Sequence, residues 1–248
     1  MAERVQNQTE EWIKSVPVPQ ATNTYVPISN TELINTLQSN LEDIGLYPVK
    51  KRYTTSNHGM EVFGDWQLSR EGDPLLLKEK YDAGDMHFGV SFVNSYDKKL
   101  KLEIIPGVRI CICSNQAMSK SGVATFDKKH IGNVGVEFPI FIQNSLEQLD
   151  VLYTNFQEAF NKLRGVSINK KVMAELAGRM YVQEDIITSE QMSLLKKEIN
   201  KSTFSQFDGD NGFNFYQHCT YAARNSHPSE MIDRYVNIHE FVTESLLQ

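Results

Sequence analysis

The stretch MHFGVSFVNSYDKKLKLEIIPGVRICIC, residues 86–113, is the most informative segment of this chain about its fold. Its segments 86–94, 98–105 and 108–113 are short and rich in β-branched and aromatic residues, which is typical of strands. The sequence NSYD at 94–97 and the dipeptide Pro106-Gly107 are turn signals between them. Strands joined by such short connections pair antiparallel, so the stretch predicts part of a β-meander.

The meander is predicted to begin earlier in the chain. The segments MEVFGDWQL at 60–68 and PLLLKEKY at 74–81 have the same composition and bring the total to about five strands. In the segment 98–105, Leu100, Leu102 and Ile104 share one face, whereas charged residues occupy the other. This alternation predicts a sheet with one covered face and one open face.

Helical patterns flank the predicted sheet. Ser29 and Glu32 form a capping-box signature before an apolar stripe that ends at Gly45. Beyond the sheet we expect a helix over 145–165 that is capped by Ser145 and Gln148. Further helices are expected over 169–185, over 188–200 with a Thr188/Gln191 cap, over 213–226 and over 229–247.

The order of elements predicts an α+β fold with an N-terminal helix, an antiparallel meander and a helical C-terminal half. We expect residues 1–28, which contain three prolines, to form an extended arm with a short helix around Trp12. Residues 29–165 are the predicted α+β core domain, and residues 166–248 a helical subdomain packed on it.

The charge is distributed unevenly along the 248 residues. The net charge of −6 argues against a generic nucleic-acid coat protein, which is usually basic. Residues 98–130, however, contain seven basic and two acidic residues, whereas 1–45 and 184–248 are acidic. This local excess indicates an anionic partner for one segment of the protein.

The cysteines and the N-terminus predict the compartment. Cys111, Cys113 and Cys219 form no disulfide framework, which is typical of reduced thiols in a cytoplasm. The N-terminus lacks an apolar signal core, and no window of about 18 uninterrupted apolar residues occurs. We therefore expect a soluble, cytoplasmic protein without a membrane partner.

The basic segment supplies the candidate binding site. If the loop around 128–130 folds over the open face, its side chains and Arg109 line one groove. The lysines and the arginine would neutralise phosphates there, and binding would weaken with salt. The candidate nucleic-acid-binding residues are Lys98, Lys99, Arg109, Asn115, Lys120, Lys128, Lys129 and His130. The alternative interpretation is a solvated loop with ordinary surface lysines.

Other chemistry has weaker support in the sequence. The spacing of His218, His227 and His239 fits no zinc site, and DGDNG at 208–212 lacks the later acidic ligands of a calcium loop. The motifs GxSxG, GxGxxG and the P-loop do not occur. We predict no cofactor. Aspartates near predicted strand ends leave a magnesium-dependent nuclease as an alternative; they are Asp65, Asp82, Asp85 and Asp97.

Three motifs carry a resemblance to a known family. They are the NSYD turn at 94–97, the C-x-N segment at 113–115 and the F-x-K-K-H loop at 126–130. With them, roughly residues 30–245 resemble a family of phage and plasmid proteins of unknown function. The segment 213–228 looks like the closing helix of that family, with Phe213 in place of its Trp and Gln217 in place of its Asn. The resemblance implies a mobile genetic element, among replication and recombination genes.

A second resemblance is one of layout. A helix, an antiparallel meander and a long following helix are similar to the core of the phage single-strand annealing proteins of the RecT and Red-beta superfamily. By analogy, that layout implies binding of single-stranded DNA along a basic groove and assembly into rings or filaments.

The leading hypothesis is a non-catalytic, phage-type protein that binds single-stranded nucleic acid in recombination or replication. Strand annealing and assembly into a homo-oligomer are extensions of this hypothesis. The alternative is a protein-interaction module of a phage, either a host-defence antagonist or a virion-associated component. A metal-dependent nuclease is the third hypothesis.

Overall fold

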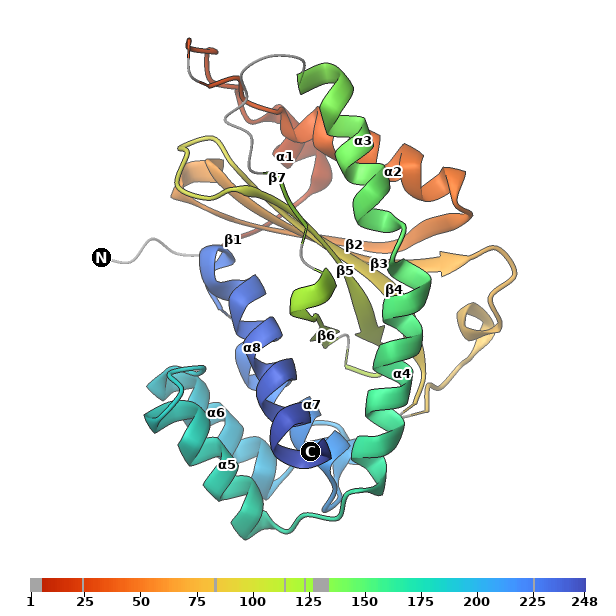
Figure 1. The fold of residues 1–248 in the computed structure, drawn as a ribbon, viewed down its shortest axis with the longest axis vertical. Coiled ribbons are helices and arrows are strands. Elements are labelled where there is room, and N and C mark those ends of the chain that lie inside the picture. Colours follow the sequence, from red (N-terminus) through yellow and green to blue (C-terminus); the bar gives the residue numbers. More distant parts are fainter. Residues whose placement is uncertain are drawn as a thin grey trace.

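One antiparallel sheet forms the centre of the molecule (Figure 1). The computed structural model describes residues 6–23, 25–82, 84–113, 115–122, 124–126, 134–224 and 226–248. The described strands are β1 Gln6–Gln8, β2 Leu46–Ser56, β3 Glu61–Arg70, β4 Met86–Ser95, β5 Leu102–Ile110, β6 Gln116–Ala117 and β7 Ala124–Phe126. They follow the order β1-β2-β3-β4-β5-β6, and β7 also pairs with β5.

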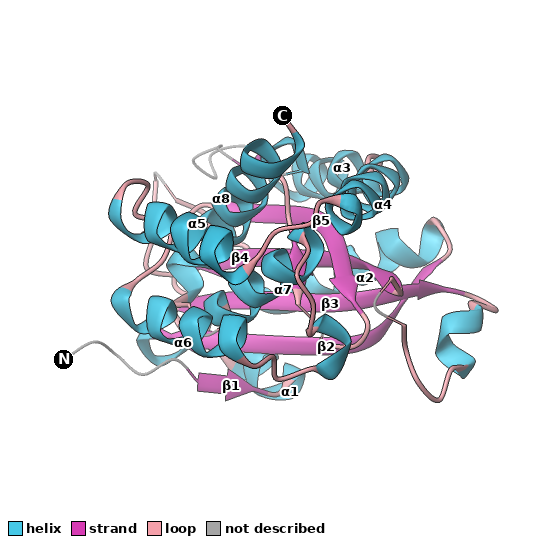
Figure 2. Ribbon diagram, turned by 90° about the horizontal axis from the view of Figure 1, so that it is seen from below, coloured by secondary structure: helices cyan, strands magenta, loops and turns pink. Residues whose placement is uncertain are grey.

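Helices cover both faces of this sheet. The described helices are α1 Glu10–Ser15, α2 Asn30–Asp43, α3 Val134–Leu146, α4 Leu149–Gly165, α5 Lys170–Val182, α6 Ser189–Asn200, α7 Gly212–Ala223 and α8 Pro228–Leu247. Figure 1 shows α1 to α3 on one side and α5 to α8 on the other, and Figure 2 looks through α5 to α8 onto the strands. The predicted α+β class with a helical C-terminal half is therefore confirmed.

Helix α2 begins and ends where the sequence predicts. The Ser29 hydroxyl accepts a hydrogen bond from the backbone N–H of Glu32 and satisfies one of the free donors of the first turn. Gly45 adopts a φ of +73°, a left-handed conformation that ends a helix and that glycine reaches without a steric penalty. The expected short helix around Trp12 is present as α1.

The long strands β3, β4 and β5 confirm the predicted meander, but two of its details are wrong. The segment from Pro74 to Leu77 is a 3₁₀ helix, η2, rather than a strand. Pro106 and Gly107 do not form a turn, because they lie inside β5 and pair with Val90 and Gly89. Proline is tolerated there because it lies between the stretch of β5 that pairs with β7 and the stretch that pairs with β6.

The helical half also follows the sequence, with one corrected cap. The Thr188/Gln191 capping box at the start of α6 is present in full. Ser145 does not cap α4: it lies inside α3, and its hydroxyl donates to the Phe141 carbonyl. The single helix predicted over 145–165 is thus the end of α3 followed by α4, with Gln148 at the N-cap of α4.

None of the described helices is long and apolar enough to cross a membrane.

The prediction of an open sheet face is wrong. Val62, Trp66 and Leu68 of β3 pack in a core with α2 and α3, whereas Phe63 packs in a second core with α4 and the C-terminal helices. The prediction was based on the charged residues of segment 98–105, of which Lys99 and Lys101 are exposed. Elsewhere on the sheet, polar side chains such as Asp65, Ser91 and Arg109 are buried.

A tight contact in the first core depends on the absence of a side chain at Gly64. The Phe92 ring lies over Gly64 and makes an edge-to-face contact with Trp66, with ring centroids 5.9 Å apart. A Cβ atom at Gly64 would lie 2.1 Å from Phe92 Cζ, well inside van der Waals contact. The ring therefore packs directly on the β3 backbone.

We expect Gly64→Ala to lower the free energy of unfolding by about 1–3 kcal/mol, because the methyl group displaces Phe92 from a close-packed core. Urea denaturation measures the effect. Gly178→Ala in α5 is the matched control: its Cβ meets no atom within 4 Å, and alanine in a helix favours folding by about 0.5–1 kcal/mol. Equal stability of the two variants would contradict the packing described here.

Candidate functional site

A cavity of about 460 Å³ lies between the sheet and the last two helices, close to the sheet edge formed by β1. Strands β2, β3 and β5 supply its base and one wall, and the end of α7 and the start of α8 close it from the other side. Its polar lining includes Arg52, Asp65, Arg109, Gln116 and Arg224. We call this cavity the arginine pocket.

Arg109 forms the floor of the arginine pocket. Its side chain is only 2% exposed, and its guanidinium is ion-paired with the carboxylate of Asp65. Arg109 lies on β5 and Asp65 on β3, with β4 between them. The stem of Arg109 crosses β4 at Gly89, where a Cβ would lie 3.1 Å from Arg109 Cγ. A glycine at this point lets an ion pair span three strands.

Hydrogen bonds connect Asp65 to a buried amide. Ser91 donates to Asp65 Oδ1 at 3.4 Å, and Gln116 Nε2 donates to Ser91 Oγ at 3.3 Å. Gln116 is only 5% exposed, and its Oε1 atom has no hydrogen-bond partner within the described part of the chain. Burying a hydrogen-bond acceptor without a partner costs free energy of folding. The Gln116 oxygen is therefore a candidate for a role beyond the stability of the fold.

Two further arginines stand at the rim. Arg52 is the cross-strand neighbour of Asp65 on β2, and Arg224 follows the last turn of α7. Both are exposed, and the Arg224 guanidinium lies 3.8 Å from the centre of the Tyr221 ring. Among the residues that the structure describes, no carboxylate forms an ion pair with either arginine. Lys51 points to the opposite face of the sheet, where it binds Glu10 and lies over Trp66.

The positive charges act on one another. Repulsion by Arg52 is the main cause that lowers the pKa of Lys50, two residues earlier on the same face of β2. Burial, followed by repulsion from Arg52, lowers the pKa of Arg109. Arginine nevertheless stays protonated in proteins, and Asp65 compensates one charge. Three guanidinium groups and one carboxylate leave the arginine pocket with a net charge of about +2.

The turn after β5 is tied to α7 beside the pocket. The Asn115 amide donates to the backbone carbonyl of Gln217 at 3.0 Å and to its Oε1 at 3.3 Å. Burial raises the pKa of the Cys113 thiol and of the Tyr235 hydroxyl to about 12 each, so both stay protonated at neutral pH. A protonated thiol is a poor nucleophile.

The structure brings together only part of the predicted site. Arg109 and Asn115 both line the arginine pocket, although each is buried rather than set on an open face. Lys98 and Lys99 lie in the turn at the far end of β5 from Arg109. The Lys98 ammonium stands 4.7 Å from the centre of the Tyr25 ring, and Lys99 pairs with Asp97 at 2.9 Å.

The remaining predicted residues lie elsewhere in the chain. Lys120 is exposed in the 3₁₀ helix η3, Lys120–Gly122, outside the lining of the arginine pocket. Lys128, Lys129 and His130 lie outside the described residues. The groove that was to join all eight residues stays a prediction.

Sequence reasoning missed Arg52 and Arg224. The run Lys50-Lys51-Arg52 was a usable signal, because three consecutive basic residues in a strand must send charge to both faces. Arg224 had no comparable signal. It reaches the pocket because the chain folds α7 and α8 back onto the sheet.

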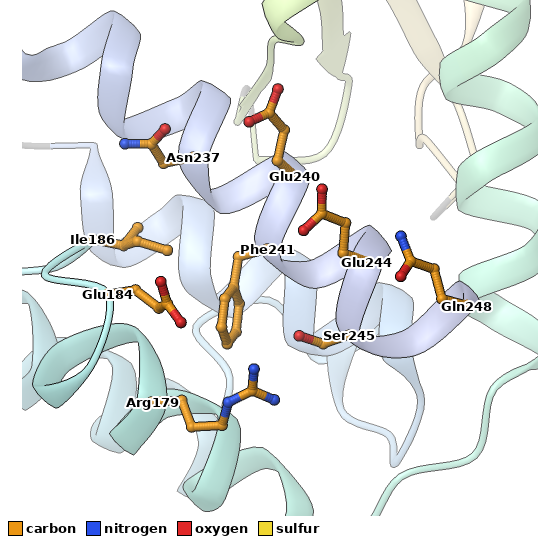
Figure 3. Close-up of a pocket in the computed structure, with 9 residues that line it drawn as sticks. All are labelled: Arg179, Glu184, Ile186, Asn237, Glu240, Phe241, Glu244, Ser245 and Gln248. Atoms are coloured by element: carbon orange, nitrogen blue, oxygen red, sulfur yellow. The ribbon is translucent and has the colours of Figure 1, made fainter.

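A second cavity, of about 550 Å³, lies between α5 and α8 (Figure 3). It is lined by Glu184, Glu240 and Glu244 and by one arginine, Arg179, whose guanidinium stands 5.1 Å from the centre of the Phe241 ring. Its acidic lining is unsuited to phosphate. No group of three or more His, Cys, Asp or Glu side chains in the described ranges is placed to hold a metal ion.

Comparison with protein-family models, with curated proteins and with solved structures finds no match for this chain. The geometry of the arginine pocket is therefore the basis for a functional assignment.

We expect Asp65→Asn to lower the free energy of unfolding by about 3–5 kcal/mol, because it leaves the buried Arg109 guanidinium without its carboxylate. The double variant Asp65→Leu/Arg109→Met should recover much of this loss, because a buried ion pair can be replaced by apolar groups at little cost.

Urea denaturation of both variants, with Asp150→Asn as the control, tests this expectation. Asp150 pairs with Arg70 on the surface, at 72% and 48% side-chain exposure, where an ion pair contributes about 0–1 kcal/mol. If Asp65→Asn were no more destabilising than Asp150→Asn, the structural role given to the Arg109–Asp65 pair would be wrong.

Proposed function

We propose that this protein binds single-stranded nucleic acid without catalysing a reaction on it, and that the arginine pocket takes a phosphate group. The observation that carries the proposal is the convergence of Arg52, Arg109 and Arg224 on one cavity, in which Asp65 is the one carboxylate among the described lining residues. Guanidinium groups match phosphate oxygens in a planar, bidentate geometry, which makes arginine the preferred residue for phosphate recognition.

The position of the charges favours a single strand over a duplex. Arg109 is buried beneath α7 and α8, so a rigid double helix cannot bring a backbone phosphate to the floor of the pocket. A flexible strand can direct one phosphate inward while its neighbours stay outside. Lys50, whose pKa reflects the proximity of Arg52, extends the positive potential beyond the rim.

We expect Arg52→Gln/Arg224→Gln to weaken the binding of a labelled single strand of about 30 nucleotides by at least tenfold at low salt. The plot of log affinity against log salt should also become less steep, by roughly 0.7 for each lost phosphate contact. Fluorescence anisotropy titrations at several salt concentrations measure both quantities. Because both arginines are exposed at the rim, the double variant should keep its fold.

Arg179→Gln is the matched control, since it removes an arginine from the acidic cavity and should leave affinity unchanged. Failure of the wild-type protein to bind the strand at low salt would overturn the proposed function. Equal binding by the wild-type protein and the double variant would show that the arginine pocket is not the binding site.

A second candidate function is self-association through the loop between β3 and β4. This loop carries η2, Pro74–Leu77, in which the Leu77 side chain is 87% exposed and Leu76 is 45% exposed. The two adjacent leucines form a small exposed apolar surface that a second copy of the chain could cover.

If the loop joins copies of the chain, Leu76→Asp/Leu77→Asp should convert a concentration-dependent oligomer into a monomer, because charge cannot be buried in an apolar contact. Sedimentation velocity over a range of protein concentrations measures this. Val151→Asp, which alters an apolar side chain that is 61% exposed on α4, serves as the control. A wild-type protein that sediments as a monomer throughout would rule out this candidate.

A further inference from the structure

We infer that the arginine pocket takes the phosphorylated end of a nucleotide chain, a terminal phosphomonoester, in preference to a phosphodiester inside the chain. The inference rests on the proposed function, in which a single strand supplies the ligand. The group that the pocket would recognise is a phosphomonoester attached to a nucleoside. Both the end of a strand and a free mononucleotide carry this group.

The charge of the pocket matches such a group. Arg52, Arg109 and Arg224 against Asp65 leave a net charge of about +2. A phosphomonoester carries a charge of about −1.5 to −2 at neutral pH, whereas an internal phosphodiester carries a single negative charge. A dianion therefore neutralises the pocket, and a monoanion leaves one positive charge without compensation in a partly enclosed space.

The size and depth of the pocket also favour a terminal phosphomonoester over an internal phosphodiester. Its volume of about 460 Å³ falls in the lower half of the range of roughly 300–1,000 Å³ that is typical of small-molecule sites. An internal phosphodiester would have to bring a nucleotide on each side of itself to the buried Arg109. An end group reaches the same depth with one nucleotide, and the rest of the strand leaves past Arg52 and Arg224 at the rim.

Gln116 indicates that the ligand is more than a phosphate. Gln116 is one of the residues that line the pocket, and its Oε1 atom is buried and lacks a hydrogen-bond partner among the described residues. An amide oxygen accepts hydrogen bonds, so it needs a donor and has no attraction for an ionised phosphate oxygen. The exocyclic amino group of a base or a sugar hydroxyl provides such a donor, which makes a nucleotide a better occupant than inorganic phosphate.

The test compares three fluorescent strands of one sequence, with a 5′-phosphate, with a 3′-phosphate, or with hydroxyls at both ends. Each strand is titrated against the wild-type protein, Arg52→Gln/Arg224→Gln and the control Arg179→Gln. We expect one phosphorylated strand to bind at least tenfold more tightly than the hydroxyl-ended strand. The double variant should abolish this preference, and Arg179→Gln should retain it. Tighter binding of the 5′-phosphorylated or of the 3′-phosphorylated strand identifies which end of the strand the protein recognises.

Calorimetry with deoxynucleoside 5′- and 3′-monophosphates and with inorganic phosphate tests the role of Gln116. Gln116→Met removes the acceptor at similar volume, so it should weaken nucleotide binding several-fold and leave the affinity for inorganic phosphate unchanged. An equal effect on both ligands, or no effect on either, would overturn the assignment of Gln116. Thermal melting of each variant confirms that the fold is intact.

The outcomes separate the inference from the proposed function. If all three strands bind equally and Arg52→Gln/Arg224→Gln weakens each of them, the protein binds single strands and the terminal-phosphate inference is wrong. If a mononucleotide binds the pocket but no strand does, the inferred chemistry holds and the proposed function fails. If neither strands nor mononucleotides bind, both are overturned.

Discussion

The ion pair between Arg109 and Asp65 is the interaction on which the polar half of this structure depends. It joins β5 to β3 across β4, and it is possible because Gly89 leaves the Arg109 stem room to cross the intervening strand. Two charges buried beneath the C-terminal helices are stable only as a pair. The pair explains how polar side chains can be buried on a sheet face that is covered by helices.

The two cores of the molecule place these polar side chains. On one face, the sheet packs against α2 and α3 through a continuous apolar surface that includes Trp66 and Phe92. On the other face, an apolar core shared with α4 to α8 gives way, near the edge strand β1 and its neighbour β2, to the arginine pocket. The C-terminal helices thus have two roles: their apolar side chains complete a core, and the junction of α7 with α8 closes a cationic cavity.

The charge distribution of the protein has a physical explanation in this arrangement. A chain with a net charge of −6 would repel nucleic acid in general, yet a partly enclosed cavity lined by three guanidinium groups keeps a local positive potential. The acidic cavity between α5 and α8 lies at a different place in the helical half, so the two potentials are kept apart. Specific binding at one site is therefore compatible with an acidic surface elsewhere.

From the sequence alone one can predict the α+β class, the limits of α2, the capping box of α6 and the strands β3 and β4, because these depend on local periodicity and on caps within a few residues. It pointed to Arg109 and Asn115 but took them for groups on an open face. Long-range packing determines that this face is covered, that Pro106 and Gly107 continue a strand, and that Arg52 and Arg224 join Arg109. Burial of a polar strand residue depends on which distant helix folds over it, and that information lies in packing between segments more than 100 residues apart, such as Arg109 and Arg224.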